Sequence, residues 1–161
     1  AAGGVNVARV WMASWDMGIE WIDTGLGDYT KRLGNAWALD QVFEIGAKYD
    51  ISIDLVLLNH GAFSESTNPE WFGSPYNAEN GGPLKSPSEF ATNETAKKFW
   101  ERRLRYIAAR YSASPALFTW EWWNEVNCYG AHSLRLVPGL RLGDIWRASS
   151  MSITGIPSFT K

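Results

Sequence analysis

The chain has 161 residues and a mass of 18.0 kDa, with 45% hydrophobic, 14% aromatic and 20% charged residues. This length suffices for one domain with a core and is too short for two ordinary domains, while the apolar content excludes an intrinsically disordered chain. The net charge of −2 argues against nucleic acid as a partner, and no apolar run approaches the roughly 20 residues that span a membrane.

Disulfide-forming and metal-binding side chains are scarce. Cys128 is the single cysteine, so an internal disulfide is excluded, and with His60 and His132 as the two histidines no structural zinc site is expected. We expect neither a metal nor another cofactor. The chain begins Ala-Ala-Gly-Gly and shows no signal peptide, although a precursor could have carried one.

Three short apolar runs have the length and composition of buried strands: Val5–Met12, Ile51–Leu58 and Leu117–Trp123. Two segments between them, Asn35–Tyr49 and Glu94–Tyr111, repeat apolar residues at helical spacing. The expected apolar stripes are Trp37, Leu39, Val42, Phe43 and Ile45 in the first segment and Phe99, Trp100, Leu104, Ile107 and Ala108 in the second. Asn93 or Thr92 is expected to cap the second helix. The β-α-β-α-β order predicts an α/β fold with parallel strands.

The connections from strand to helix, Ala13–Gly34 and Asn59–Asn93, are much longer than those from helix to strand. In α/β folds such loops lie at the C-terminal ends of the strands and build the active site. Their aromatic residues favour the walls of a cleft, and a simple cover over an exposed sheet face is the alternative. These aromatic residues are Trp15, Trp21, Trp71, Phe72 and Tyr76.

The pattern changes after Asn127, and we divide the chain there into a domain of residues 1–127 and a tail of residues 128–161. The tail has no clear period and holds one acidic residue, Asp144, against four basic ones. It is either a native extension or the product of a frameshift or truncation near codon 128. The abrupt loss of pattern favours the frameshift.

The segment Trp120–Asn127 (WEWWNEVN) ends the third expected strand. Alternation would place Glu121, Trp123 and Glu125 on one side of that strand, with Glu125 at its C-terminal end. A carboxyl that is partly desolvated among indole rings favours its neutral form, which suits a general acid, and the Asn124 amide can bond a sugar hydroxyl. Equally, Glu125 can be an ordinary loop carboxylate beside core tryptophans.

The Asn124-Glu125 pair after a tryptophan-rich strand resembles the Asn-Glu motif that ends strand four of clan A glycoside hydrolases, notably glycoside hydrolase family 5. Arg9 in VARVW is similar to an arginine near the end of strand two of these enzymes. His60 in LLNHG is similar to a histidine near the end of strand three. The similarity extends from Val5 to Asn127 and is of the cellulase or mannanase type.

This resemblance implies a partial (β/α)8 TIM barrel, about strands two to four, from an enzyme that cleaves β-linked polysaccharides such as β-1,4-glucan or β-mannan with retention. It implies that Glu125 is the proton donor and later the general base, and that Asn124 binds the sugar 2-hydroxyl. His60 would bond a sugar hydroxyl or the carboxylate network, and Arg9 would orient the nucleophile. The candidates for stacking on sugar rings are Trp15, Trp21, Trp71 and Trp123.

Each of these roles has a structural alternative. Arg9 can pair with Glu121 inside the barrel, because a buried arginine needs a carboxylate. His60 can be a satisfied core histidine, and each tryptophan can serve packing alone.

The resemblance also implies a nucleophilic glutamate at the end of strand seven, whereas the one carboxylate after Asn127 is Asp144. A complete barrel takes about 250 residues. We therefore interpret the chain as a fragment, inactive alone, of a protein expected to be secreted. The expected partner is a polysaccharide or oligosaccharide, with neither nucleic acid nor membrane, and the oligomeric state stays open. The alternatives are a non-catalytic carbohydrate-binding module and an inactive half-barrel that pairs with another chain.

Overall fold

The structure is a computed structural model in which residues 3–125 are described. Residues 1–2 and 126–161 lie outside the described part. The predictions that concern the tail, including its boundary near Asn127 and the carboxylate of Asp144, therefore fall on residues of which nothing structural is said.

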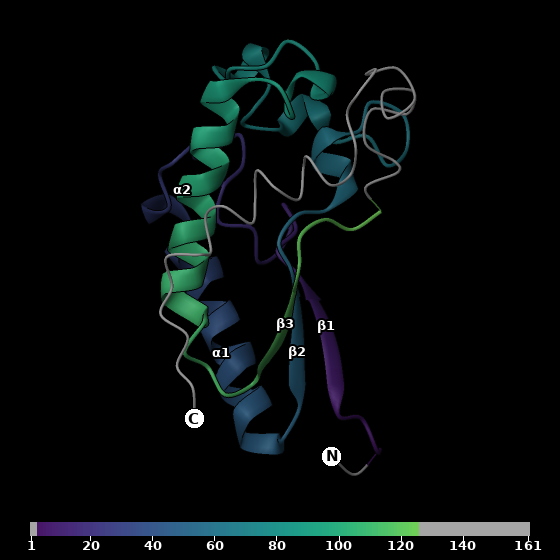
Figure 1. The fold of residues 1–161 in the computed structure, drawn as a ribbon, viewed down its shortest axis with the longest axis vertical. Helices are drawn as coiled ribbons and strands as arrows, with labels where there is room; N and C mark the ends of the chain where they lie inside the picture. Colours follow the sequence, from purple (N-terminus) through teal and green to yellow (C-terminus); the bar gives the residue numbers. More distant parts are fainter. Residues whose placement is uncertain (1–2, 126–161) are drawn as a thin grey trace.

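A parallel sheet of three strands forms the centre of the fold. Strands β1 (Val7–Trp11), β2 (Ser52–Val56) and β3 (Leu117–Glu121) pair in the order β1-β2-β3. Figure 1 shows them side by side, with helices α1 (Leu33–Tyr49) and α2 (Glu94–Tyr111) along one face. The predicted α/β order and the parallel pairing are confirmed.

The two faces of the sheet differ in chemistry because successive side chains point to opposite sides. On the helix-covered face, Ile53 and Leu55 are buried in the hydrophobic core, with Ala8 and Val10 of β1 packed against it. On the other face, the register places Arg9 beside Asp54. A register shift between Ile53 and Asp54 interrupts the β2–β3 pairing. The polar face of the sheet thus carries charged groups that no helix of the described chain covers.

Helix α1 packs on the sheet through part of the predicted stripe. Leu39 and Phe43 are buried as expected, but Trp37 and Ile45 are 61% and 52% exposed. The remaining buried positions are Ala36 and Gly46. A Cβ atom at Gly46 would lie 2.9 Å from the Ile51 carbonyl oxygen, so a small residue is needed for the close approach of α1 to β2. The buried face of α1 is therefore apolar and also small at Ala36 and Gly46.

Helix α2 packs beside α1 on the same face of the sheet. Trp100, Leu104 and Ile107 are buried, whereas Phe99 and Ala108 of the predicted stripe are only partly buried. The Phe43 and Tyr111 rings stack at a centroid distance of 5.1 Å, joining the two helices. At the surface, Arg110 makes a bidentate ion pair with Asp40, with N–O distances of 2.9 and 2.6 Å.

The two long connections fold into short helical turns and not into extended loops. The first contains η1 (Thr30–Arg32), and the second contains η2 (His60–Phe63), η3 (Trp71–Gly73), η4 (Ala78–Asn80) and η5 (Pro87–Glu89). Figure 1 shows the second connection gathered above the C-terminal ends of the strands. The aromatic residues predicted to line a cleft differ in exposure: Trp71 and Tyr76 are buried, whereas Trp15 and Phe72 are exposed.

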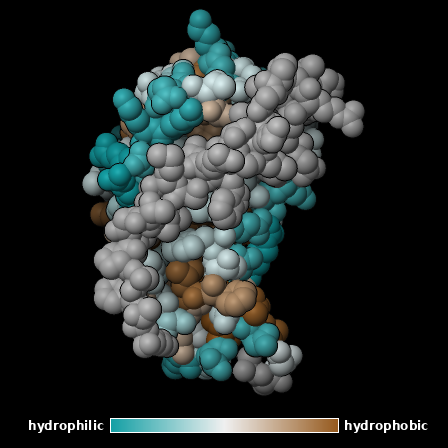
Figure 2. All heavy atoms as spheres, in the orientation of Figure 1, coloured by the Kyte–Doolittle hydropathy of each residue, from teal (hydrophilic) through white to brown (hydrophobic). Residues whose placement is uncertain are grey.

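The exposed apolar residues of the described chain include Val7 on β1 and Phe118 on β3. Figure 2 shows the apolar surface of one face low on the molecule, away from the connections above the strand ends. Among residues 3–125, no helix is long and apolar enough to cross a membrane.

Asn93 caps α2, one of the two residues predicted for this position. Its side-chain oxygen accepts hydrogen bonds from the backbone N–H groups of Thr95 and Ala96, both at 3.0 Å. Replacing such a cap by alanine costs about 1 kcal/mol, because the orphan N–H groups at the start of a helix lose their acceptor. We expect Asn93→Ala to lower the free energy of unfolding, measured by urea denaturation, by that amount. Asn93→Ser, which keeps an acceptor, is the control, and an equal loss in both variants would contradict the capping role.

Candidate active site

Side chains from β1 and from the segments that follow β2 and β3 meet on the polar side of the sheet. Arg9 comes from β1, His60 follows β2, and Asn124 and Glu125 follow β3. Parallel strands end at the same edge of a sheet, so residues distant in the sequence come together there. The backbone N–H of Asn124 donates to the Leu58 carbonyl at 2.9 Å, which extends the β2–β3 contact beyond the strands. The four residues predicted to be catalytic therefore form one connected group.

Arg9 is the charged centre of this group. Its guanidinium makes a bidentate pair with Glu121, with Nε–Oε2 and Nη2–Oε1 distances of 2.7 and 2.6 Å. The same Nη2 donates to Asn124 Oδ1 at 2.7 Å, and the guanidinium lies 5.0 Å from the centroid of the Trp11 ring. The hydrogen bond to Glu121 raises the pKa of Arg9, and the charges of Glu121, Asp54 and Glu125 act in the same direction. Arg9 therefore makes the ion pair with Glu121 that was named as its structural role, and it also contacts Asn124 directly.

His60 is buried at 5% exposure and contacts three neighbours. Its Nδ1 lies 3.2 Å from Asn124 Nδ2 and 3.4 Å from Glu125 Oε2, and its Nε2 lies 3.2 Å from Asn68 Nδ2. Because Arg9 holds the Asn124 carbonyl oxygen, the Asn124 amino group faces His60. When that amino group donates to Nδ1, the imidazole proton is on Nε2. The Asn68 amide must then turn over, so that its oxygen replaces the nitrogen found 3.2 Å from Nε2 and accepts this proton.

The backbone around Glu125 does not follow the alternation predicted for a continuing strand. β3 ends at Glu121, and Glu125 has a φ of 50°, in the left-handed region that non-glycine residues rarely adopt. Trp123 packs against Phe63 and Phe90, with ring centroids 5.1 and 5.6 Å apart. The prediction that Glu121, Trp123 and Glu125 share one side of a strand is therefore wrong in its basis. The Asn124 contacts, and not the pleat, bring Glu125 to His60.

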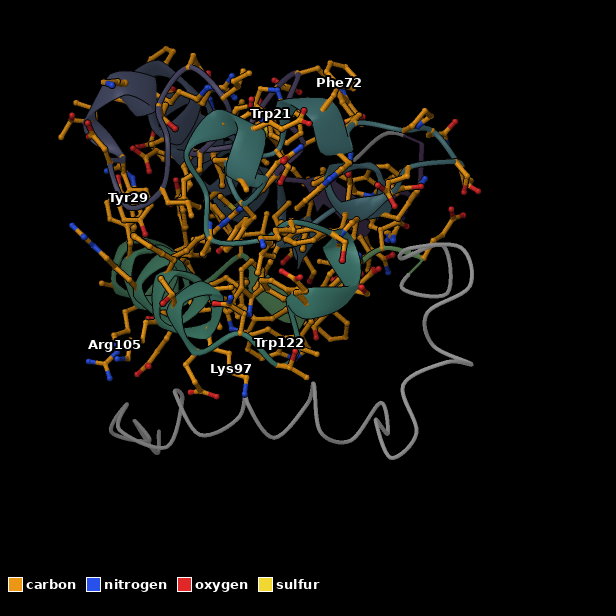
Figure 3. The ribbon with its side chains drawn as sticks, turned by 90° about the horizontal axis from the view of Figure 1, so that it is seen from above. Trp21, Tyr29, Phe72, Lys97, Arg105 and Trp122 are labelled. Carbon is orange, nitrogen blue, oxygen red and sulfur yellow. The ribbon has the colours of Figure 1, made fainter. Side chains whose placement is uncertain are left out.

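The four tryptophans predicted to bind substrate have different environments. Trp15 is 65% exposed and open to a ligand, whereas Trp71 is buried and contacts Phe63 at a ring distance of 5.8 Å. Trp123 belongs to the same aromatic cluster. Trp21 is partly buried against Gly73, where an added Cβ would lie 2.8 Å from its ring. Figure 3 shows Trp21 beside Phe72 at one edge of the connection layer.

A buried ion pair between Arg103 and Glu20, for which the sequence gives no signal, joins α2 to the first connection. Arg103 of α2 donates from Nη2 to the Leu57 carbonyl at 2.9 Å, and its Nη1 lies 3.7 Å from Glu20 Oε2. Glu20 Oε1 accepts from the Gly27 N–H at 2.7 Å. Burial raises the pKa of Glu20, and the positive charge of Arg103 opposes that change. A charged residue within a largely polar helical stretch has no sequence signal that marks it as buried.

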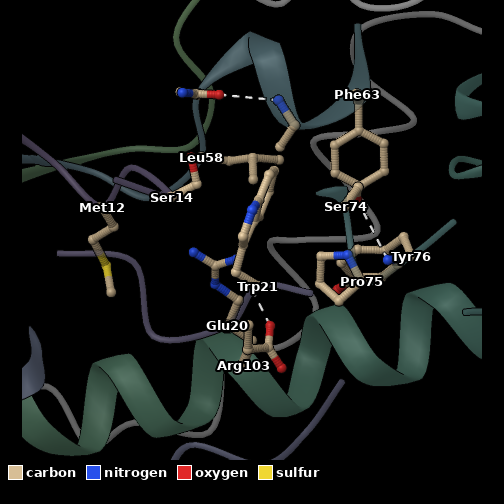
Figure 4. A pocket seen from close by; sticks show the side chains of 12 residues that line it. Met12, Ser14, Glu20, Trp21, Leu58, Phe63, Ser74, Pro75, Tyr76 and Arg103 are labelled. Atoms are coloured by element: carbon tan, nitrogen blue, oxygen red, sulfur yellow. Dashed lines mark hydrogen bonds and ion pairs between the residues drawn. The ribbon is translucent and has the colours of Figure 1, made fainter. Parts of the chain in front are cut away.

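Figure 4 shows the cavity beside this pair, which Glu20, Trp21, Tyr76 and Arg103 help to line. Its volume of about 20 Å³ has room for about one water molecule. This cavity is too small for a sugar, so the Glu20–Arg103 pair belongs to the scaffold. Within residues 3–125, no group of three or more His, Cys, Asp or Glu side chains is arranged to hold a metal ion.

Comparison with known proteins finds two distant relatives, both glycosidases. No family model matches the chain. It is 26% identical over 136 residues to mannan endo-1,4-beta-mannosidase 1 of Arabidopsis thaliana, an alignment that covers 80% of this chain and 30% of the plant protein. It is 26% identical over 139 residues to mannan endo-1,4-beta-mannosidase 4 of Oryza sativa subsp. japonica, covering 80% and 28%.

The chain therefore spans less than a third of the length of these curated relatives. The similarity supports a distant relationship to glycosidases.

Asp54 gives a pH-dependent test of the site. Burial and the charge of Glu121 raise its pKa, against the opposing charge of Arg9. The folded chain thus binds this proton more tightly than the unfolded chain does. Its contribution to stability is complete below the unfolded pKa of about 3.9 and is lost as pH rises through the folded pKa.

We expect the free energy of unfolding of the wild type, minus that of Asp54→Asn, to fall as pH rises from acid to neutral. Urea denaturation of both proteins across this range measures the difference. A difference that is constant or increases with pH would show that Asp54 is not held in this environment. Asp16→Asn, at an exposed position of the first connection, is the control.

Proposed function

We propose that residues 1–127 are part of the catalytic domain of a retaining glycoside hydrolase that cleaves β-1,4-linked mannan or glucan. One observation carries the proposal: Arg9 of β1 forms a continuous polar group with His60, Asn124 and Glu125, which follow the C-terminal ends of β2 and β3. The similarity to two plant mannan endo-1,4-beta-mannosidases supports the substrate class. No cofactor or metal takes part in the proposed reaction.

In this mechanism Glu125 donates a proton to the leaving oxygen and then, as a carboxylate, activates the water that completes hydrolysis. His60 Nδ1 lies 3.4 Å from Glu125 Oε2, and as an acceptor it favours the protonated carboxyl group that the first step requires. The Asn124 amino group bonds the 2-hydroxyl of the sugar at the cleaved bond, an interaction that strengthens in the transition state.

The attacking carboxylate must lie about 5–5.5 Å from the acid/base in a retaining enzyme. Both carboxylate oxygens of Glu121 already accept hydrogen bonds from Nε and Nη2 of Arg9, so we do not assign Glu121 as the nucleophile. We propose that the nucleophile comes from a later strand, as the resemblance to glycoside hydrolase family 5 implies, and that Arg9 keeps it ionised and oriented. The 161-residue chain is then inactive alone.

The proposal includes a partial (β/α)8 barrel. The sheet has three parallel strands, with two helices on one face and charged residues on the other. This arrangement is consistent with three strands of a barrel whose interior is the face that carries Arg9 and Asp54. The complete protein acts on polymers and is proposed to be secreted, because such substrates lie outside the cell. The division at residue 127 belongs to the same proposal.

The coding DNA tests this proposal. We expect translation of all three forward frames from codon 115 to reveal, past codon 128, further β/α units and a strand that ends in a glutamate among aromatic residues. Such a frame would supply the nucleophile. A reading frame that stops after Lys161 with no such continuation would count against the hydrolase and favour the carbohydrate-binding module or the half-barrel.

Hydrolysis assays complete the test. The 161-residue chain should release no reducing ends from soluble β-mannan. If it does release them, and if Glu125→Gln abolishes that release, the prediction that the chain is inactive alone is wrong. In the extended polypeptide, Glu125→Gln should lower kcat on β-mannan about 10²–10⁴-fold, because general acid catalysis is lost. The loss should be smaller with an activated aryl glycoside, whose leaving group needs no proton, and Glu44→Gln on the exposed side of α1 should change neither rate.

A further inference from the structure

A second hollow lies within the Asn59–Asn93 connection, and none of the residues that line it belongs to the Arg9–Glu125 group. It has a volume of about 490 Å³, within the range of about 300–1,000 Å³ typical of ligand sites. We call it the outer groove. The lining residues that matter here are Glu65, Trp71, Phe72, Asn77, Glu79 and Lys85.

The floor of the outer groove is preformed. Trp71 and Asn77 are buried, and Asn77 donates to the Trp71 carbonyl at 3.2 Å while its side-chain oxygen accepts from the Glu79 N–H at 3.0 Å. Trp71 rests on Phe63, which contacts Tyr76 and Phe90 of the core. A ligand would therefore meet a surface already held in place by the aromatic cluster.

The rim of the groove combines one apolar ring with polar groups. Phe72 is 73% exposed and points outward from the edge seen in Figure 3. Glu65 and Glu79 offer hydroxyl acceptors, and Lys85 offers a donor. A flat ring beside separate acceptors and a donor matches a pyranose, which has an apolar face and a ring of hydroxyls. Two carboxylates against one ammonium group disfavour a polyanion.

The groove is joined to the candidate active site through one loop. Glu65 and Pro69 line the groove, and Asn68 between them contacts His60 Nε2 at 3.2 Å. Asn68 has a φ of 44°, which turns the chain sharply at this point. The opposite ring nitrogen of His60 faces Asn124 and Glu125. A polymer that reaches Glu125 thus has a second contact surface on the other side of this loop.

We propose that the outer groove binds a β-1,4-linked hexose chain at a sugar remote from the cleaved bond, with Phe72 stacked on one pyranose ring. The proposal rests on the proposed function, because that function supplies the ligand class. It adds a binding site that does not contain the acid/base. Binding at the groove would hold the polymer without taking part in proton transfer.

The test is a titration of the 161-residue chain with β-1,4-mannohexaose, followed by amide NMR and calorimetry. Signals of Phe72, Ala78 and Glu79 should shift, and Phe72→Ala should weaken the affinity about two- to tenfold, the amount expected for one lost ring contact. Trp37→Ala is the matched control, since Trp37 is a similarly exposed aromatic on α1, and it should leave the affinity unchanged.

Equal affinity in the wild type, Phe72→Ala and Trp37→Ala would overturn the proposal that the outer groove binds sugar. It would show that the saccharide binds elsewhere on the chain. Absence of mannohexaose binding at millimolar concentration would overturn it outright. Glu65→Gln with Glu79→Gln provides a second variant that keeps the ring, and retained affinity there together with loss in Phe72→Ala assigns binding to stacking. The coding-frame and hydrolysis tests do not involve Phe72, so the groove and the hydrolase can fail independently.

Discussion

The guanidinium of Arg103 is the contact on which the arrangement of the strand ends depends. It is buried, lies 5.5 Å from the centroid of the Trp100 ring, and donates to the carbonyl of Leu57, where β2 gives way to the loop that carries His60. Burying an arginine is costly unless a carboxylate and hydrogen-bond acceptors accompany it. Here the Leu57 carbonyl accepts one hydrogen bond, and the Glu20 carboxyl group lies 3.7 Å from the guanidinium. One side chain thereby joins α2, the end of the central strand and the first connection.

The second arginine, Arg9, meets a different requirement. It lies on the face of the sheet that no described helix covers, and its partners are Glu121 and Asn124. The Glu121 pair fixes the guanidinium, and the guanidinium fixes the direction of the Asn124 amide. The amide then determines which nitrogen of His60 accepts a hydrogen bond. Arg9 of β1 is therefore connected to Glu125 by successive polar contacts through Asn124 and His60, and not by a direct ion pair.

The sequence was sufficient for the order of elements because each strand is a short apolar run and each helix repeats at 3.6 residues. It failed where volume or a distant partner decides burial. A side chain larger than hydrogen does not fit at Gly46, where α1 approaches the sheet, and Trp37 is exposed although its apolar character predicts burial. Arg103 was missed because its partner, Glu20, is far away in the sequence. Asn68 was missed for the same reason: no local pattern links it to His60.

These differences explain why the candidate site could be named but not built from the sequence. The residues were found through their positions after strands, yet Glu125 lies beyond the last strand pairing and has a left-handed backbone. Its position follows from the Asn124 N–H on Leu58 and from His60, which two asparagines hold. Left-handed residues of this kind persist only where their surroundings over-determine them. The polar contacts of Asn124 and His60 meet that condition, and they do so at the strand ends where an acid/base would act.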